Sequence, residues 1–146
     1  MDYRDDLDWI RYRPVGFNQH AGPFFIAHVE GPKYYMHLHI EPHHLNQGGV
    51  VHGGVSMTLA DNAMGVAAWH AAGERPTATI EFGMKFIAAG KAGGPLYGRA
   101  EIERRTKDLC FLSGELWSNG RKIATASGVW KYIDPPNGWG SGAAGG

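Results

Sequence analysis

Residues 53–72 read GGVSMTLADNAMGVAAWHAA and are the longest stretch of the chain that favours one helix. Alanine, the best helix former, is frequent in this stretch, and Gly73 is a natural helix stop. Such a helix would be about 27–30 Å long. Its only formal charge is on Asp61, and small or apolar residues occupy every side. The pattern therefore predicts a central helix that is buried almost all round.

The segments on either side of this helix alternate apolar and polar residues, which is the period of a strand covered on one face. Strands are expected at residues 24–30, 33–41, 79–86, 97–105, 109–117 and 122–132. Asn119-Gly120 predicts a tight hairpin between the last two strands. Because the connecting turns are short, the sheet should be mainly antiparallel. The sequence thus predicts an α+β fold in which an antiparallel sheet wraps around one long helix.

The chain has 146 residues, which is the size of one domain. We expect an N-terminal extension with helical character at residues 1–23, the domain itself at 24–134, and a flexible glycine-rich tail at 135–146. One copy of the chain would leave part of the central helix uncovered, and its sheet would have open edges. These features predict a symmetric dimer.

Lysine plus arginine and aspartate plus glutamate both total 14, so the net charge is zero, which argues against a nucleic-acid-binding domain. The charges are uneven, with 10 basic and 5 acidic residues in the segment 75–131, so this half could receive a phosphate. Cys110 is the only cysteine, which excludes an intramolecular disulfide and fits a reducing compartment. The N-terminal residues lack the basic start and apolar stretch that are typical of a signal peptide, and no apolar run approaches transmembrane length, so we expect a cytoplasmic protein that binds no membrane.

The start of the long helix is the first candidate for chemistry. Gly53 and Gly54 have no side chains to block a ligand, and free N–H groups at a helix N-terminus could polarise a carbonyl and hold an oxyanion. His52 precedes them, and its side chain could have a structural role, either in helix capping or in core packing. Asp61 follows two turns later, with no lysine or arginine between residues 34 and 73. Such a carboxylate either has a functional role or is a solvated residue or one bonded to a partner strand.

A metal site is a weaker hypothesis, although all eight histidines lie in residues 1–70. His37, His39 and Glu41 share one face of a predicted strand. His37 and Glu41 would be about 13 Å apart on that strand, too far to bind one ion. We therefore expect no metal and no separate cofactor.

The segment before and within the helix resembles the signature of a known family. The matching residues are Asn46-x-x-Gly49-x-x-His52-Gly53-Gly54, followed by Leu59-Ala60-Asp61. This pattern is similar to that of hotdog-fold thioesterases, in particular the PaaI-like branch of the 4-hydroxybenzoyl-CoA thioesterase superfamily. A weaker similarity extends from about residue 17 to residue 133.

The resemblance implies hydrolysis of an acyl-CoA thioester by a homodimer, or by a tetramer built from two dimers. Asp61 would correspond to the catalytic carboxylate, acting as nucleophile or as the base that activates water. The Gly53 N–H would bind the thioester carbonyl, while Asn46 and His52 would orient substrate or water. Gly54 would border the substrate, and Thr79 would face the site. In this family the aspartate and the oxyanion site come from opposite subunits.

One departure from the family concerns the CoA contacts. Many members follow the strand near Thr79 with Phe-Leu-Arg-Pro, whereas residues 86–89 here are Phe-Ile-Ala-Ala. Arg104, Arg105 and Lys107 could replace the missing cation, the alternative being a solvated turn. A module that binds acyl-CoA without hydrolysis, or a dimeric scaffold with a residual pocket, remains open. The identity of the acyl group is also open. Its pocket could include Met57, Met64, Trp69, Phe82 or Trp130.

Overall fold

The computed structural model describes residues 4–12, 15–29 and 31–134. In chain order the elements are β1 (Ile10–Tyr12), α1 (Phe17–Ala21), β2 (Phe24–His28), β3 (Lys33–His39), the 3-10 turn η1 (Pro42–His44), α2 (Gly53–Ala71), β4 (Thr77–Phe86), β5 (Pro95–Arg105), β6 (Leu109–Ser118) and β7 (Arg121–Tyr132). The predicted glycine-rich tail, residues 135–146, lies outside the described residues. Neither described helix is long and apolar enough to cross a membrane.

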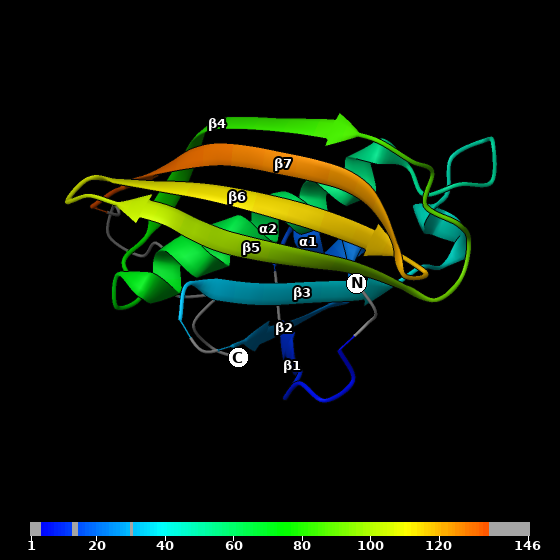
Figure 1. The fold of residues 1–146 in the computed structure, drawn as a ribbon, viewed down its shortest axis with the longest axis horizontal. Helices are drawn as coiled ribbons and strands as arrows, with labels where there is room; N and C mark the ends of the chain where they lie inside the picture. Colours follow the sequence, from blue (N-terminus) through cyan, green and yellow to red (C-terminus); the bar gives the residue numbers. More distant parts are fainter. Residues whose placement is uncertain (1–3, 13–14, 30, 135–146) are drawn as a thin grey trace.

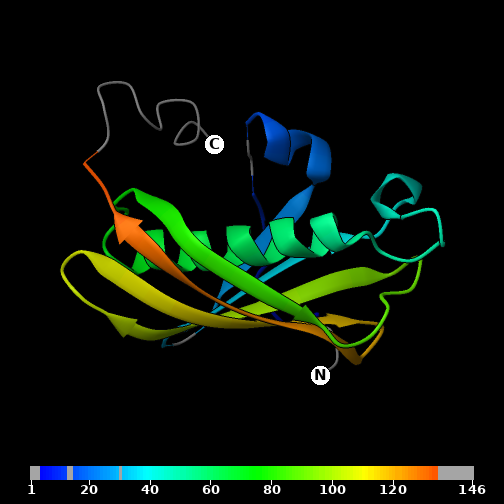
Figure 2. The same cartoon turned by 90° about the horizontal axis from the view of Figure 1, so that it is seen from above.

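The seven strands form one sheet in the order β1-β2-β3-β5-β6-β7-β4, and every neighbouring pair is antiparallel. The sheet curves around α2, which lies across its concave face (Figures 1 and 2). Asn119 and Gly120 both have positive φ, as a two-residue hairpin turn of this kind requires. The predicted antiparallel α+β architecture is therefore confirmed.

Helix α2 ends one residue before the predicted position and packs on the sheet through small and aliphatic side chains. The buried members are Ser56, Leu59, Ala60, Ala63, Met64, Ala67 and Ala68. Gly114 of β6 makes this close packing possible, because a Cβ atom at that position would collide with the Met64 methyl group. The other face of α2, which includes Met57 and Asp61, is exposed or only half-buried. The helix is therefore buried on the sheet side and not all round, because a single sheet covers only one of its faces.

The N-terminal extension is integrated into the fold. Among its described residues, 4–12 and 15–23, the only helix is α1, which lies on the side of α2 away from the sheet (Figure 2). Strand β1 pairs with β2 at the sheet edge. Leu7 and Trp9 pack on the outer face of the sheet against an aromatic cluster of Tyr35, Tyr97 and Trp117. The extension therefore contributes to both faces of the domain.

Strand β4 departs from the predicted alternation at one position. In its pairing with β7, Thr79 is opposite Trp130 and Glu81 is opposite Val129, so Ile80 is the extra residue of a bulge. Ile80 is 55% exposed, although it belongs to the same alternating set as the half-buried Phe82 and Met84. The bulge sets the direction of Thr79, and it lies on the free edge of the sheet.

Candidate active site

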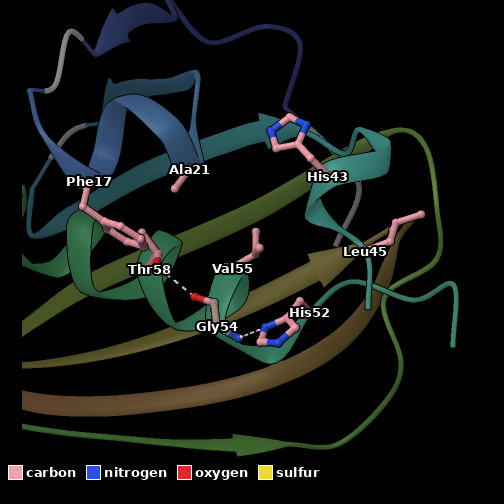
Figure 3. Close-up of a pocket in the computed structure, with 8 residues that line it drawn as sticks. All are labelled: Phe17, Ala21, His43, Leu45, His52, Gly54, Val55 and Thr58. Carbon is pink, nitrogen blue, oxygen red and sulfur yellow. Dashed lines mark hydrogen bonds between the residues drawn. The ribbon is translucent and has the colours of Figure 1, made fainter. Parts of the chain in front are cut away.

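The first turn of α2 is held by His52. The side chain of His52 accepts a hydrogen bond at Nδ1 from the Gly54 N–H, at 2.8 Å (Figure 3). The His52 carbonyl accepts bonds from the N–H groups of Val55 and Ser56. His52 is thus the N-cap of the helix, which is the structural alternative considered from the sequence.

The Gly53 N–H differs from its neighbours, because it makes no hydrogen bond to any of the described residues. It lies at the positive end of the helix dipole, where a polarised carbonyl oxygen is stabilised. A Cβ atom added to Gly53 would lie 3.3 Å from the Phe86 ring, so this part of the helix start is narrow. The Gly53 N–H is therefore suited to donate a hydrogen bond to a planar carbonyl group.

Asp61 lies in the middle of α2 and is half-buried. The Thr79 hydroxyl donates a hydrogen bond of 2.8 Å to Asp61 Oδ1, and no lysine or arginine among the described residues forms an ion pair with the carboxylate. Burial raises the pKa of the Asp61 carboxyl above its ordinary value, and the Thr79 hydrogen bond offsets part of that rise. The fold therefore joins two of the predicted site residues, one from the helix and one from β4.

Gly53 and Asp61 are not brought together within one chain. They are eight residues apart on a continuous helix, which corresponds to about 12 Å along its axis. Groups that act on one carbonyl must lie within about 3–3.5 Å of the reacting atoms. One copy of the chain therefore does not place both groups on the same thioester.

Asn46 has a local structural role. Its Oδ1 accepts hydrogen bonds from the N–H groups of Gly48 and Val50, at 2.8 and 3.3 Å. These bonds close the glycine-rich turn that leads into His52. Asn46 therefore shapes the approach to the helix N-terminus, and its oxygen is already engaged in that turn.

Two pockets lie on the face of α2 that the sheet does not cover. The first, of about 310 Å³, is at the helix N-terminus and is lined by Phe17, Ala21, His43, Leu45, His52, Gly54, Val55 and Thr58 (Figure 3). The second, of about 350 Å³, is lined by Phe17, Asn18, Met57, Thr58, Asp61, Asn62 and Phe82. Of the five sequence candidates for the acyl pocket, Met57 and Phe82 line this second pocket. Met64 and Trp130 are instead buried in the core, and Trp69 lies in the last turn of the helix.

The three basic candidates lie elsewhere. Arg104 and Arg105 end β5 and Lys107 lies in the following turn, all exposed. The Arg75 side chain, just after α2, donates a hydrogen bond of 2.8 Å to the Lys107 carbonyl. The basic turn is therefore at the C-terminal end of α2, opposite the end that carries Gly53 (Figure 1).

Sequence reasoning missed the contribution of α1. Phe17 lines both pockets, and Asn18 exchanges two side-chain hydrogen bonds with Asn62, at 3.1 and 3.0 Å. The one hint in the sequence is that Asn62 follows Asp61 directly, so that a residue bound to Asn62 lies beside the site. No periodicity links a five-residue helix to a residue 44 positions later.

The histidines considered as metal ligands, His37 and His39, lie on β3 and line neither pocket. The His37 and His39 rings are 5.4 Å apart, and His37 is packed between Trp9 and Phe25. Within residues 4–12, 15–29 and 31–134, no group of three or more histidine, cysteine, aspartate or glutamate side chains could hold a metal ion.

His52→Ala is expected to lower the free energy of unfolding by about 1 kcal/mol, because the Gly54 N–H loses its acceptor. His52→Asn is the matched control, since asparagine is a good N-cap and should retain most of the stability. Urea unfolding of the three proteins provides the measurement. Equal stability of His52→Ala and the wild type would contradict the capping role.

Asp61→Asn is expected to raise the melting temperature at neutral pH by a few degrees. Because the folded-state pKa of Asp61 is raised, stability decreases as pH rises through the unfolded and then the folded pKa, and this loss persists at neutral pH. Asparagine has no charge, so its advantage should disappear when the pH falls below the ordinary aspartate pKa of about 3.9. Thermal unfolding from about pH 3.5 to about pH 8 measures how the gain in melting temperature depends on pH. Asp108→Asn, at an exposed position, is the control. A gain that is constant with pH would contradict it.

The comparisons with known proteins identify the family. Residues 48–125 match the family model of the thioesterase superfamily. Protein PA0474 of Pseudomonas aeruginosa, assigned as an esterase, is 32% identical over 110 residues, covering 75% of this chain and 82% of the relative. Acyl-coenzyme A thioesterase 13 of Mus musculus is 23% identical over 117 residues, covering 79% of this chain and 84% of the relative. The chain belongs to the thioesterase superfamily.

The solved structures agree on the fold. The E. coli PaaI protein from the phenylacetic acid degradation operon superposes with a TM-score of 0.71 at 20% identity, covering 79% of this chain and 83% of that one. The predicted PaaI-like hotdog fold is confirmed, and so is the prediction of an enzyme of the thioester hydrolase class. The roles of individual residues remain predictions.

Proposed function

We propose that the chain hydrolyses a small acyl- or aryl-CoA to the free acid and CoA, at a site built from two copies of the chain. The environment of Asp61 is the main support for this proposal. Asp61 is a half-buried carboxylate with a raised pKa, bound to the Thr79 hydroxyl and bordering an apolar pocket. An ionisable group in these surroundings is typical of a catalytic position.

The distance along α2 explains why two copies are needed. A two-fold axis near Met57, midway between Gly53 and Asp61, would place Asp61 of one copy beside Gly53 of the other. Met57 is an exposed apolar residue at that midpoint. Two equivalent sites would then form, each with one carboxylate and one helix N-terminus.

The surface around this axis supports self-association. The free edge of β4 carries the exposed apolar side chains Ile80 and Phe86, with Ile87 following directly. Open strand edges and exposed apolar patches are typical protein–protein contacts. The homodimer of this proposal covers both features, and a tetramer would be formed by two such dimers.

The chemistry follows from the two groups. The Gly53 N–H and the helix dipole polarise the thioester carbonyl and stabilise the oxyanion as the carbon becomes tetrahedral. Asp61 either removes a proton from the water that attacks this carbon, or attacks it directly to form an anhydride that water then cleaves. In both routes the C–S bond breaks, the sulfur of CoA leaves and is protonated, and water supplies the oxygen of the acid. The raised pKa of Asp61 brings its proton affinity closer to that needed near neutral pH.

The remaining parts of the proposal concern binding and location. In the two-copy arrangement, the basic turn of Arg104, Arg105 and Lys107 lies on the side of Asp61 that faces away from the two-fold axis. It could therefore meet the phosphates of CoA bound across both copies. Asn46 and His52 support the substrate by holding the loop and the helix start. No cofactor other than the CoA of the substrate is required, and a cytoplasmic location stays a prediction from the sequence.

Release of free thiol from acetyl-, hexanoyl-, decanoyl- and benzoyl-CoA tests the function. We expect turnover of at least one ester, with saturation kinetics. If calorimetry instead detects binding of these esters and no thiol appears, the chain is an acyl-CoA-binding module. Absence of both binding and turnover would indicate a scaffold.

A further inference from the structure

Helix α1 covers part of the proposed catalytic face. It lies on α2 on the side away from the sheet (Figure 2) and places Phe17 at both pockets. Figure 3 shows the Phe17 side chain reaching from α1 towards Thr58 of α2. Phe17 is nevertheless 71% exposed, which is unfavourable for a phenyl ring unless something covers it. The ring is therefore placed as a wall rather than as part of the core.

Two sets of hydrogen bonds hold α1, and with it Phe17, in place. In the first turn of α1, Asn18 forms a pair with Asn62 of α2, in which each residue donates an Nδ2–H to the other's Oδ1. At the end of α1, the Ala21 carbonyl accepts a hydrogen bond of 2.8 Å from Nε2 of His44, which is 1% exposed. The His44 Nδ1 accepts the Glu41 N–H at 3.0 Å, so its other ring nitrogen must be the donor to Ala21. These bonds connect α1 both to the residue after Asp61 and to the turn before α2.

The pocket beside Asp61 suits the uncharged end of the substrate. Phe17, Met57 and Phe82 give it apolar walls, and no lysine or arginine lines it. The phosphates of CoA therefore have no partner among its lining residues, whereas an acyl group buries apolar surface there. Because Asp61 borders the same pocket, an acyl group in it has its carbonyl next to the reacting carboxylate.

We propose that Phe17 is a specificity-determining residue, whose ring closes the acyl pocket against α2 and restricts the enzyme to short aliphatic or single-ring aromatic acyl groups. This inference rests on the proposed function, since Asp61 marks the reacting end of the pocket. Removing the ring opens the pocket towards the solvent side of α1. Longer acyl chains then fit without displacing the helix.

Phe17→Ala is expected to raise the ratio of kcat/KM for decanoyl-CoA to that for hexanoyl-CoA by about 10-fold or more, the range found when a pocket gains or loses apolar contacts. Phe17→Trp should lower the ratio. Phe111→Ala is the matched control, because Phe111 is 37% exposed on β6 and alternates with the buried Cys110 and Leu112, which places it on the outer face of the sheet. An unchanged ratio in Phe17→Ala would overturn the proposal.

Two further measurements separate this inference from its alternatives. Light scattering checks the mass of Phe17→Ala, and a change of mass with an unchanged ratio would assign Phe17 to the contact between copies, which also overturns the proposal. Calorimetry with hexanoyl- and decanoyl-CoA on the Asp61→Asn background measures the same preference without turnover. If Asp61→Asn hydrolyses at the wild-type rate, the proposed mechanism fails, while a shifted binding preference in the Phe17→Ala double variant would still support the wall.

Discussion

Asp61→Asn should lower kcat for the best thioester by about 10²–10⁴-fold, the usual effect of losing an acid–base group. Asparagine has nearly the same shape, and its carbonyl oxygen can still accept the Thr79 hydroxyl, so the local geometry should persist. What is lost is the group that attacks or removes a proton. Steady-state thiol release at saturating substrate measures the change.

The pH dependence of the hydrolysis rate is a second test of the role of Asp61. Since burial raises the pKa of Asp61, the rate should fall on the acidic side at a pH above that of an ordinary aspartate. Thr79→Val removes the hydrogen bond that lowers this pKa, so the acidic limb should move to higher pH. A folded Asp61→Asn protein with the wild-type rate would refute the role of Asp61.

Gly53→Pro should lower kcat by about 10²–10³-fold, the effect of removing one oxyanion donor. Proline removes the N–H yet suits the first position of a helix. The preceding residue must be extended, and His52 already has φ −62° and ψ 134°. The helix should therefore form with its donor missing. Thiol release, with circular dichroism to verify folding, provides the measurement.

Gly53→Ala is the matched control for this substitution. It places a Cβ atom against the Phe86 ring, as proline does, but it keeps the N–H. We expect its rate to stay within a few-fold of the wild type. Equal rates in the proline and alanine variants would mean that the Gly53 N–H does not act on the carbonyl.

The main elements of the fold follow from local patterns. Alanine content and Gly73 set the limits of α2 to within one residue, and alternation located the strands of the sheet. These features depend on neighbours in the sequence, so one chain is enough to find them. The Asn119-Gly120 turn is of the same kind, because positive φ at both positions is a local requirement.

Features that depend on distant contacts could not be predicted. Strand β1 and helix α1 are too short for periodicity, and each is fixed by partners elsewhere, such as the Asn18–Asn62 pair. The bulge at Ile80 depends on how β4 registers against β7. Alternation along the strand therefore gives no sign of the bulge.

Part of the candidate site could be proposed from the sequence as a set of residues, but its geometry could not. The spacing from Gly53 to Asp61 is visible in the sequence, and on a straight helix it already separates the two groups. The Thr79 contact with Asp61 comes from the packing of β4 on α2, and the wall formed by Phe17 from the packing of α1. Both require the folded chain.

Mixed dimers of Asp61→Asn and Gly53→Pro test directly whether two copies share one site. A dimer containing one of each has one site with both groups intact and one with neither. If copies exchange freely at equal amounts, half of the dimers are mixed, and about a quarter of the wild-type activity should return. Activity no higher than that of the two separate variants, in a sample shown to contain mixed dimers, would contradict the shared site.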